Sequence, residues 1–397
     1  MDAPLKGLKV VELARSLTGP WIGQTLADLG ADVVKIESPK GDETRGWGPP
    51  FIEHNGERTA SYFHVCNRGK RSVVTDFGTE EGQVLVRRLT EEADVLIENF
   101  RVRGLERYGL DYQSLKKLNP RLVYCSVTGF GQDGPYALRT AYEYAIEGMS
   151  GIMAVTGDTD GRPLKTGVAF GSITTALYAV IGIQAALQQR EITGLGQHID
   201  MALMDCMVAS MCNQAMNYFV TGGSPARLGN VHPHIAPYEV YAVADGEIII
   251  ACGNDEQFGN LANLLGKPEL PADDRFAHNE GRVANRLALN EIIGPPITTW
   301  RRDDLIAALA DAGVSAGPIN SVAEALEDPQ IRHRGLRIDT DGIPGLRTPI
   351  TFSANALQIG RPAPGLGEHT EEVLAELGLL PDDLDEADAQ TISDEVG

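Results

Sequence analysis

The first 130 residues alternate between short apolar segments and helical segments, and this alternation restricts the fold more than any other feature. Buried strands are predicted at residues 8–14, 31–37, 71–77, 93–100 and 121–128. Helices are predicted between them, one over residues 19–29 with Pro20 in its first turn, and one over residues 80–92 that Thr79 caps. The pattern predicts an α/β fold with a parallel, doubly wound sheet. Ligands of such sheets gather at the carboxyl ends of the strands.

The second half of the chain has a different pattern. Long helices are predicted at residues 143–153, 172–191 and 197–221, followed by a turn-rich linker at 222–230. Two strands at residues 238–252, joined by the hairpin signal Asp245-Gly246, and helical segments from 255 to 312 predict a small α+β domain. Short strands are expected near residues 317–319, 336 and 347–352. We therefore expect a large domain at 1–221, a small domain at 222–320, and a return to the large domain at 321–397.

Composition limits the function classes. The 397-residue chain carries a formal charge of −21, which argues against nucleic acid or an anionic membrane as a partner. It has 43% hydrophobic and 22% charged residues, as soluble enzymes have, and its five cysteines include no C-x-x-C pair. That cysteine usage, without a signal-peptide or membrane-span pattern, predicts a cytoplasmic protein.

Two candidate catalytic residues, Ser172 and Glu143, lie at the starts of predicted helices. Ser172, after Gly171, is expected to be the N-cap of the long apolar helix, and a backbone-exposing turn at this place is also where enzymes hold an acyl-transfer nucleophile. Glu143 is either a first-turn carboxylate that interacts with the helix dipole or an acid of the site.

Other polar clusters are candidates for binding. Asn67-Arg68-Gly69-Lys70-Arg71 is either a solvated loop or a phosphate clamp. Asn99, Phe100 and Arg107 follow a predicted strand end and suit a nucleotide-like ligand, through an amide, a ring and a guanidinium. The glycine-rich segment 129–134 is interpreted as a loop that lets backbone approach a ligand, and His232-Pro233-His234 is not interpreted as a metal site.

Taken together, the chain resembles the family III CoA-transferases, the group of formyl-CoA transferase and carnitine CoA-transferase. The matching stretches are spread over nearly the whole chain, and they include LKGLKVVELA, TGPWIGQTLADLGADVVKIESPKGDETRGWGPPF, NRGKRSV, ADVLIENFRVRGLERYGLDY, YCSVTGFGQDGPY, AYEYAIEGMSGIMAVTG, ITGLGQHIDMALMD, GNVHPHIAPYEVY, AGVSAGPINSV and GLGEHTEEVL. The resemblance implies a Rossmann-like domain built from both chain ends, a smaller domain, and a homodimer whose chains are interlocked.

The resemblance also assigns residues. It places Lys70 and Arg71 near CoA phosphates, and Asn99, Phe100 and Arg107 along the nucleotide and pantetheine path. Glu143 resembles the glutamate that formyl-CoA transferase has at this place. It implies coenzyme A and acyl-CoA as substrates, with no prosthetic group and no metal.

The position of the family's catalytic aspartate is occupied here by Ser172. In this family the aspartate attacks an acyl-CoA thioester to give a mixed anhydride, and CoA thiolate then converts the aspartyl group to an enzyme thioester. A serine hydroxyl can accept an acyl group as an ester, but it has no carbonyl that could hold CoA.

Four functions therefore remain open. The first is a CoA-transferase for a small carboxylic or dicarboxylic acid, with Glu143 or a partner chain replacing the aspartate. The second is a CoA-binding subunit of a heteromeric transferase of the benzylsuccinate type. An acyl-CoA racemase is less favoured, because the positions of its histidine and aspartate are Tyr142 and Ser172. The last is a CoA-ester-binding protein without catalysis.

Overall fold

The computed structural model describes residues 2–379, and the part of the predicted C-terminal return from residue 380 onward lies outside it. The described chain forms two compact units. Unit 1 comprises residues 2–152, 165–216 and 333–379, and unit 2 comprises residues 153–164 and 217–332. The three-part division at residues 222 and 321 stays a prediction about domains.

Unit 1 is built on a six-stranded parallel sheet of order β5-β2-β1-β6-β7-β8, which is the strand order of a Rossmann fold. Its strands are β1 (Lys9–Glu12), β2 (Asp32–Glu37), β5 (Arg71–Val74), β6 (Val95–Glu98), β7 (Val123–Thr128) and β8 (His198–Ala202). The α/β class and the parallel sheet predicted from the sequence are confirmed. Strand β8 was missed, because residues 197–202 were expected to belong to a helix.

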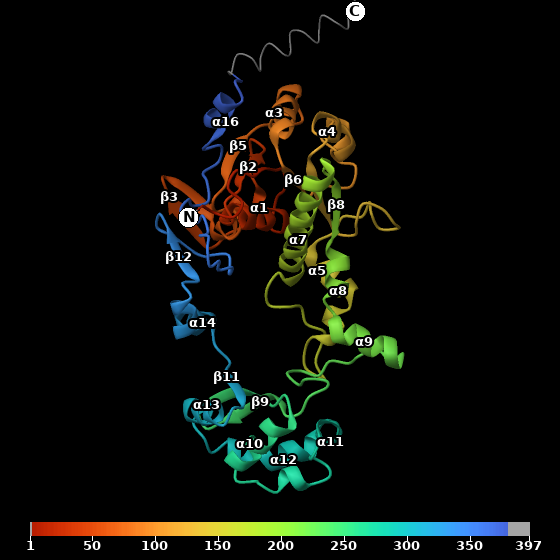
Figure 1. Cartoon of the computed structure of the whole chain (residues 1–397), viewed down its shortest axis with the longest axis vertical. Coiled ribbons are helices and arrows are strands. Elements are labelled where there is room, and N and C mark those ends of the chain that lie inside the picture. The colour runs from red at the N-terminus through yellow and green to blue at the C-terminus, as the bar shows by residue number, and fades with distance from the viewer. Residues whose placement is uncertain (1, 380–397) are drawn as a thin grey trace, which may run out of the picture. The chain divides into compact units, whose positions relative to one another are not determined.

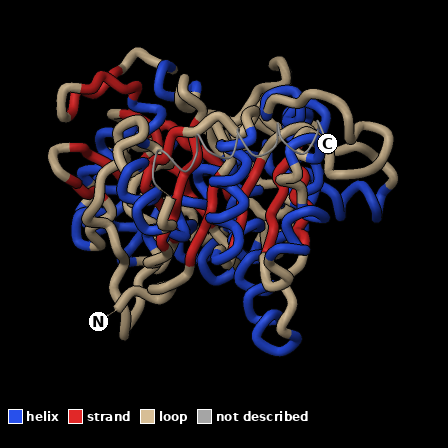
Figure 2. The backbone as a smooth tube through the Cα atoms, turned by 90° about the horizontal axis from the view of Figure 1, so that it is seen from above, coloured by secondary structure: helices blue, strands red, loops and turns tan. Residues whose placement is uncertain are grey.

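Helices cover both faces of this sheet, and Figure 2 shows the strands as a layer between them. On one face, α1 (Thr18–Asp28) and α7 (Phe170–Thr193) bury apolar side chains against β1, β2, β6 and β7. On the other face lie α3 (Glu80–Glu92), α4 (Tyr112–Leu118) and α16 (Thr370–Glu376). Thr79 does cap α3, because its hydroxyl accepts from the Gly82 N–H.

The other elements of unit 1 are two hairpins and several short helices. Two antiparallel hairpins are formed by β3 (Phe51–His54) with β4 (Glu57–Ala60), and by β12 (Arg337–Thr340) with β13 (Ile343–Leu346). The shorter helical elements are η1 (Glu43–Gly46), α2 (Ser61–His64), η2 (Glu106–Tyr108), α5 (Glu143–Ser150) and α8 (Leu203–Ala209). Three further helices, α6 (Ile152–Val155), α9 (Cys212–Thr221) and α15 (Pro329–His333), include residues of both units. The strand expected at residues 347–352 is wrong, since β13 ends at Leu346.

The C-terminal segment joins the N-terminal part of the chain, as Figure 1 shows by the blue helix α16 near β5. The Thr370 hydroxyl accepts from the Val74 N–H at 3.0 Å, and the His369 N–H donates to the Ser72 carbonyl at 2.9 Å. Unit 1 is therefore formed from both ends of the described chain.

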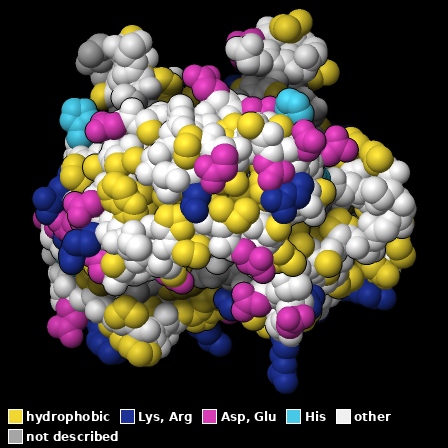
Figure 3. Space-filling model, turned by 90° about the horizontal axis from the view of Figure 1, so that it is seen from below, with side chains coloured by type: hydrophobic (Ala, Val, Ile, Leu, Met, Phe, Trp, Pro, Cys, Tyr) yellow, Lys and Arg dark blue, Asp and Glu magenta, His cyan; other side chains and the backbone are white. Residues whose placement is uncertain are grey.

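Unit 2 has a three-stranded antiparallel sheet of order β11-β10-β9. The hairpin at Asp245-Gly246 is confirmed as β9 (Tyr238–Val243) and β10 (Gly246–Ala251), while the strand expected near residue 317 is β11 (Ser315–Pro318). The helical elements are α10 (Asp255–Leu264), η3 (Leu270–Ala272), α11 (Asn279–Ala284), α12 (Arg286–Ile297), α13 (Arg302–Asp311) and α14 (Val322–Glu327). On the face shown in Figure 3, cationic and acidic side chains are interspersed.

Candidate active site

Helix α7 begins two residues earlier than the sequence predicts, and this changes the interpretation of Ser172. The N-cap is Ala169, which supplies no side-chain hydrogen bond, so Ser172 lies in the first turn. The N-cap prediction for Ser172 is wrong. Backbone N–H groups of a first turn have no partner within their helix, and they need an acceptor from elsewhere.

The acceptor is Glu143. Its Oε1 accepts from the Ser172 N–H at 3.1 Å, and its Oε2 accepts from the Ser172 hydroxyl at 2.8 Å. Ser172 is buried and Glu143 is half-buried. A carboxylate at the positive end of the 24-residue helix α7 is electrostatically favoured. The structure thus brings together the two residues that the sequence marked as candidates for catalysis.

Two further contacts fix this helix start. Gly171 packs against Met207 of α8 so closely that a Cβ at residue 171 would overlap the Met207 side chain. One turn along α5 from Glu143, the buried carboxylate of Glu147 accepts from the Thr166 N–H and holds the segment before α7. Packing against α8 and hydrogen bonds to α5 therefore set the geometry around Ser172.

Tyr62, which lies near Glu143, and its neighbour Trp47 were not identified from the sequence. Burial raises the pKa of the Tyr62 phenol, and the nearby Cys66 and Glu143 raise it further. The Trp47 ring lies 5.3 Å from the Tyr62 ring, centroid to centroid, and Trp47 is 42% exposed. Because tryptophan is seldom left exposed in a turn, Trp47 in GWGPPF was the signal that could have revealed this side of the site.

Lys70 is not available to a phosphate. Its side chain is fully buried, and its ammonium donates to Glu12 Oε1 at 2.9 Å, to the Pro20 carbonyl at 2.9 Å and to Asn67 Oδ1 at 2.8 Å. Burial lowers the pKa of Lys70, against the opposing effect of Glu12. The phosphate role expected for Lys70 therefore does not fit the structure, because all its donors are used internally.

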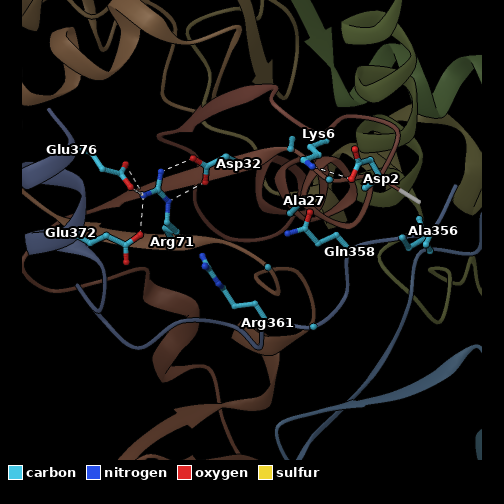
Figure 4. A pocket seen from close by; sticks show the side chains of 16 residues that line it. Asp2, Lys6, Ala27, Asp32, Arg71, Ala356, Gln358, Arg361, Glu372 and Glu376 are labelled. Carbon is cyan, nitrogen blue, oxygen red and sulfur yellow. Dashed lines mark hydrogen bonds and ion pairs between the residues drawn. The ribbon is translucent and has the colours of Figure 1, made fainter.

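Arg71 also has internal partners, at the amino end of β5. Figure 4 shows its guanidinium between Asp32 and two glutamates of α16. The distances are 2.5 Å to Asp32, 3.1 Å to Glu372 and 2.8 Å to Glu376. The amino ends of parallel strands lie at the edge opposite their carboxyl ends, so Arg71 does not join the cluster that follows β6. Lys70 therefore forms an internal ion pair with Glu12, and Arg71 forms three, with Asp32, Glu372 and Glu376, while a phosphate-binding role for Arg71 stays a prediction.

The residues after β6 lie at the carboxyl edge of the sheet, as expected. Asn99 binds the backbone of Arg15, with Oδ1 accepting from its N–H at 2.9 Å and Nδ2 donating to its carbonyl at 2.7 Å. The exposed Arg15 guanidinium lies 5.2 Å from the Phe100 ring centroid. The exposed Arg107 guanidinium lies 4.5 Å from the Tyr108 ring centroid. Arg15, at the end of β1, is a cation of this edge that sequence reasoning missed.

Within residues 2–379, no cluster of three or more His, Cys, Asp or Glu side chains is arranged to hold a metal ion. In unit 2, His234 Nε2 hydrogen-bonds Asn217 Oδ1 at 2.9 Å, and the His234 N–H donates to His232 Nδ1 at 3.1 Å.

Comparisons with known proteins agree with this architecture. A model of the family described as CoA-transferase family III matches residues 5–370. A "Succinate--glutarate CoA-transferase" of Agrobacterium fabrum is 54% identical over 385 residues, which are 95% of this chain and 96% of that protein. A human "Succinyl-CoA:glutarate CoA-transferase" is 35% identical over 382 residues, covering 94% of this chain and 86% of that protein.

A solved structure gives the same result for the fold. The crystal structure of a CAIB/BAIF family protein from Brucella suis superposes with a TM-score of 0.86 at 60% identity, covering 95% of this chain and 100% of that chain. With a family match over nearly its whole length and relatives far above 30% identity, the chain belongs to CoA-transferase family III.

Proposed function

We propose that this enzyme moves CoA between succinyl-CoA and a second small dicarboxylic acid, and that Glu143 is its nucleophile. The substrate class is supported by the relatives, two of which are named for succinate or succinyl-CoA with glutarate. The nucleophile is supported by the contact between Glu143 and Ser172, which places a carboxylate at the helix start where the family has its aspartate.

The chemistry requires a carboxylate that is attacked in its turn. A Glu143 oxygen attacks the thioester carbonyl of succinyl-CoA, the C–S bond breaks, and a mixed anhydride and CoA thiolate form. The thiolate attacks the Glu143 carbonyl, succinate leaves, and CoA is held as a glutamyl thioester. The acceptor carboxylate attacks that carbonyl and expels the thiolate. The thiolate then attacks the acceptor's acyl carbon, which releases the new acyl-CoA and Glu143.

Ser172 assists rather than attacks in this scheme. Its N–H donates to Oε1 of Glu143 and its hydroxyl to Oε2, so when Oε2 is the oxygen that is acylated, Oε1 keeps the Ser172 N–H as its donor. When the carboxyl carbon of Glu143 becomes tetrahedral, the negative oxygen retains a backbone N–H at the end of a helix dipole. A serine in this role replaces the family aspartate without carrying an acyl group.

CoA is proposed to bind along the carboxyl edge of the sheet. Arg15 and Arg107 offer exposed guanidinium groups to phosphates, and the Phe100 ring offers an apolar face. Asn99, whose amide is used by the Arg15 backbone, fixes the edge to which the ligand binds.

A second candidate is the incomplete subunit of a heteromeric transferase. One observation favours it, since α7 presents an exposed apolar face that Leu177, Tyr178 and Ile181 form, and an additional chain could cover this face. We propose instead that a second copy of this chain covers it, as in the interlocked dimer that the resemblance implies.

We further propose a cytoplasmic enzyme without a prosthetic group. By length and composition α7 could span a membrane. Its Ala176, Ala179 and Ile183 are nevertheless fully buried in the core of the parallel sheet, as in the central helix of a globular domain.

The decisive experiment compares variants in transfer of CoA from succinyl-CoA to glutarate by the purified protein alone. Glu143→Gln is expected to lower kcat by on the order of 10³-fold or more. Ser172→Ala should keep measurable turnover, and Glu91→Gln, at an exposed ion pair with Arg88 on α3, serves as the control. Borohydride added during turnover should reduce the glutamyl thioester, and peptide mass spectrometry should place the resulting alcohol at residue 143.

Two outcomes would contradict the proposal. Transfer that survives in Glu143→Gln but disappears in Ser172→Ala would make Ser172 the essential group. A wild-type protein that is inactive alone, but gains activity as Ser172→Asp, would support the incomplete subunit.

A further inference from the structure

A buried carboxyl group lies directly beneath the segment that carries Asn99 and Phe100. Glu98 is the last residue of β6, and it pairs in register with Ser126 of β7, which pairs with Asp200 of β8. Glu98 is 5% exposed and Ser126 is 2% exposed. Glu98 Oε2 accepts from the Phe100 N–H at 2.8 Å, so this carboxyl group holds the backbone of a residue proposed to bind CoA.

Ser126, the in-register neighbour of Glu98, connects this carboxyl group to a histidine. Its hydroxyl lowers the pKa of Glu98, as a hydrogen-bond donor facing the carboxylate does, and its oxygen lies 2.9 Å from His198 Nε2. The His198 ring stacks on Tyr112 at 5.2 Å. A cavity of about 180 Å³ adjoins Glu98, Ser126 and His198, and it gives water a route to the chain of hydrogen bonds.

Glu98 is a buried acid without a cationic partner among the described residues. Burial raises its pKa to about 7, with a small contribution from Asp200 in the same direction, while the Ser126 and Phe100 hydrogen bonds act against it. The titratable and charged groups around it are Tyr124 and Cys125 on β7, His198 and Asp200 on β8, Asp111 and Tyr112 at the start of α4, and Arg101, Arg103 and Glu106 in the segment after β6.

We propose that Glu98 is a proton-dependent positioning residue for CoA, and that CoA binding places a proton on it. The proposal rests on the proposed function, since it takes residues 99–107 as part of the CoA site. Glu98 touches no substrate in this scheme. It acts through the Phe100 N–H, and its charge opposes the phosphates of CoA at the same edge of the sheet.

The chain of hydrogen bonds can carry the proton. With Glu98 ionised, His198 Nε2–H donates to the Ser126 oxygen, and the Ser126 hydroxyl donates to the carboxylate. With Glu98 protonated, its O–H donates to Ser126 and the Ser126 hydroxyl donates to Nε2, while His198 carries its proton on Nδ1. One proton is taken from water, and no buried donor loses its acceptor in either state.

The direction in which CoA affinity changes with pH follows from the linkage between proton binding and CoA binding. Because polyanionic CoA disfavours the ionised form, binding raises the pKa of Glu98, and affinity should be higher at pH 6 than at pH 8. A rise of one pKa unit on binding corresponds to about a tenfold change in Kd.

The test measures the Kd of CoA by calorimetry at pH 6, 7 and 8. Wild type should bind several-fold more weakly at pH 8 and take up protons, as seen from buffers of different ionisation enthalpy. Glu98→Gln should lose this part of the dependence while still accepting from the Phe100 N–H. The 3′-phosphate of CoA titrates near pH 6 with every variant, and it adds the same pH dependence to each Kd. The quantity to compare is therefore the difference in pH dependence between a variant and wild type. Glu92→Gln, at an exposed glutamate of α3 outside residues 99–107, is the matched control.

A second variant, Ser126→Ala, tests the proposal even if Glu98→Gln does not fold. Ser126→Ala keeps the bond from Phe100 but removes a hydrogen bond that stabilises the ionised carboxylate, so the midpoint of the pH dependence should move upward. If wild type and Glu98→Gln bind CoA with the same pH dependence, the proposed role of Glu98 is wrong, while the proposed CoA site is unaffected. If wild type does not bind CoA at any pH, the proposed CoA edge is wrong, and this inference falls with it.

Discussion

Two buried lysines of unit 1 share one carboxylate. Lys70 and Lys35 both approach Glu12 Oε1, at 2.9 and 3.1 Å, and Lys35 also pairs with Asp42 at 3.0 Å. Gly23 of α1 makes room for them, because a Cβ there would overlap the Glu12 carboxylate. Lys70 thus stabilises the crossing of α1 over the sheet, and its importance lies in stability rather than in binding.

Replacing Lys70 should therefore be costly. Lys70→Met leaves Glu12 with one cation and removes the donor to Pro20 and Asn67. We expect a loss of about 3 kcal/mol in the free energy of unfolding, the lower end for a broken buried pair, since Lys35 still neutralises Glu12. Lys9→Met, at an exposed pair with Glu92, should cost no more than about 0.5 kcal/mol. Chemical denaturation of both variants measures the difference, and equal costs would contradict the argument.

At the scale of elements, α16 is held on the sheet by Arg71. The guanidinium pairs with Glu372 and Glu376 of α16 and with Asp32 of β2, all three half in solvent. Figure 4 shows that these carboxylates approach it from both sides. Three hydrogen bonds attach the same segment independently: the His369 N–H donates to the Ser72 carbonyl, the Gly367 N–H donates to the Ser72 hydroxyl, and the Val74 N–H donates to the Thr370 hydroxyl.

Arg71→Ala should loosen α16 without unfolding the sheet. Burial of Arg71 alone does not make it essential, because the hydrogen bonds of residues 367–370 remain. We expect the amide protons of α16 to exchange about tenfold faster, while those of β1 and β6 stay protected. Hydrogen exchange read by mass spectrometry resolves the two regions, with Arg87→Ala as the control at an ion pair confined to α3. Uniform loss of protection would show that Arg71 supports the whole unit.

The elements also show what sequence patterns can predict. Apolar runs bounded by helix signals located five strands of the sheet, because buried parallel strands have that composition. Strand β8 was missed because HIDMA runs directly into the apolar helix LMDCMVA, so the two elements share one apolar stretch. The roles of Ser172 and Lys70 depend on Glu143 and Glu12, which are 29 and 58 residues away. No local pattern reports a partner at that distance.

At the scale of the whole molecule, α7 has apolar side chains on two sides. Ala176, Ala179 and Ile183 are fully buried against the sheet, whereas Leu177, Tyr178 and Ile181 are 48%, 48% and 63% exposed. A contiguous apolar face on a long helix is unusual on a monomer and typical of an interface. Because the first turn of this helix also contacts Glu143, the proposed nucleophile, an interface along α7 would link dimer formation to the active site.

Ile181→Asp therefore tests the proposed dimer. Wild type should scatter light as a dimer at micromolar concentration, and a buried carboxylate in the interface should weaken the dimer by about 100-fold or more. Leu287→Asp, at an apolar residue of α12 that is 81% exposed, should leave the mass unchanged. A dimer unaffected by Ile181→Asp would place the interface elsewhere. A monomeric wild type that regains activity only with a related chain would instead mean that the face on α7 receives a different subunit, and that Glu143 is one half of a shared site.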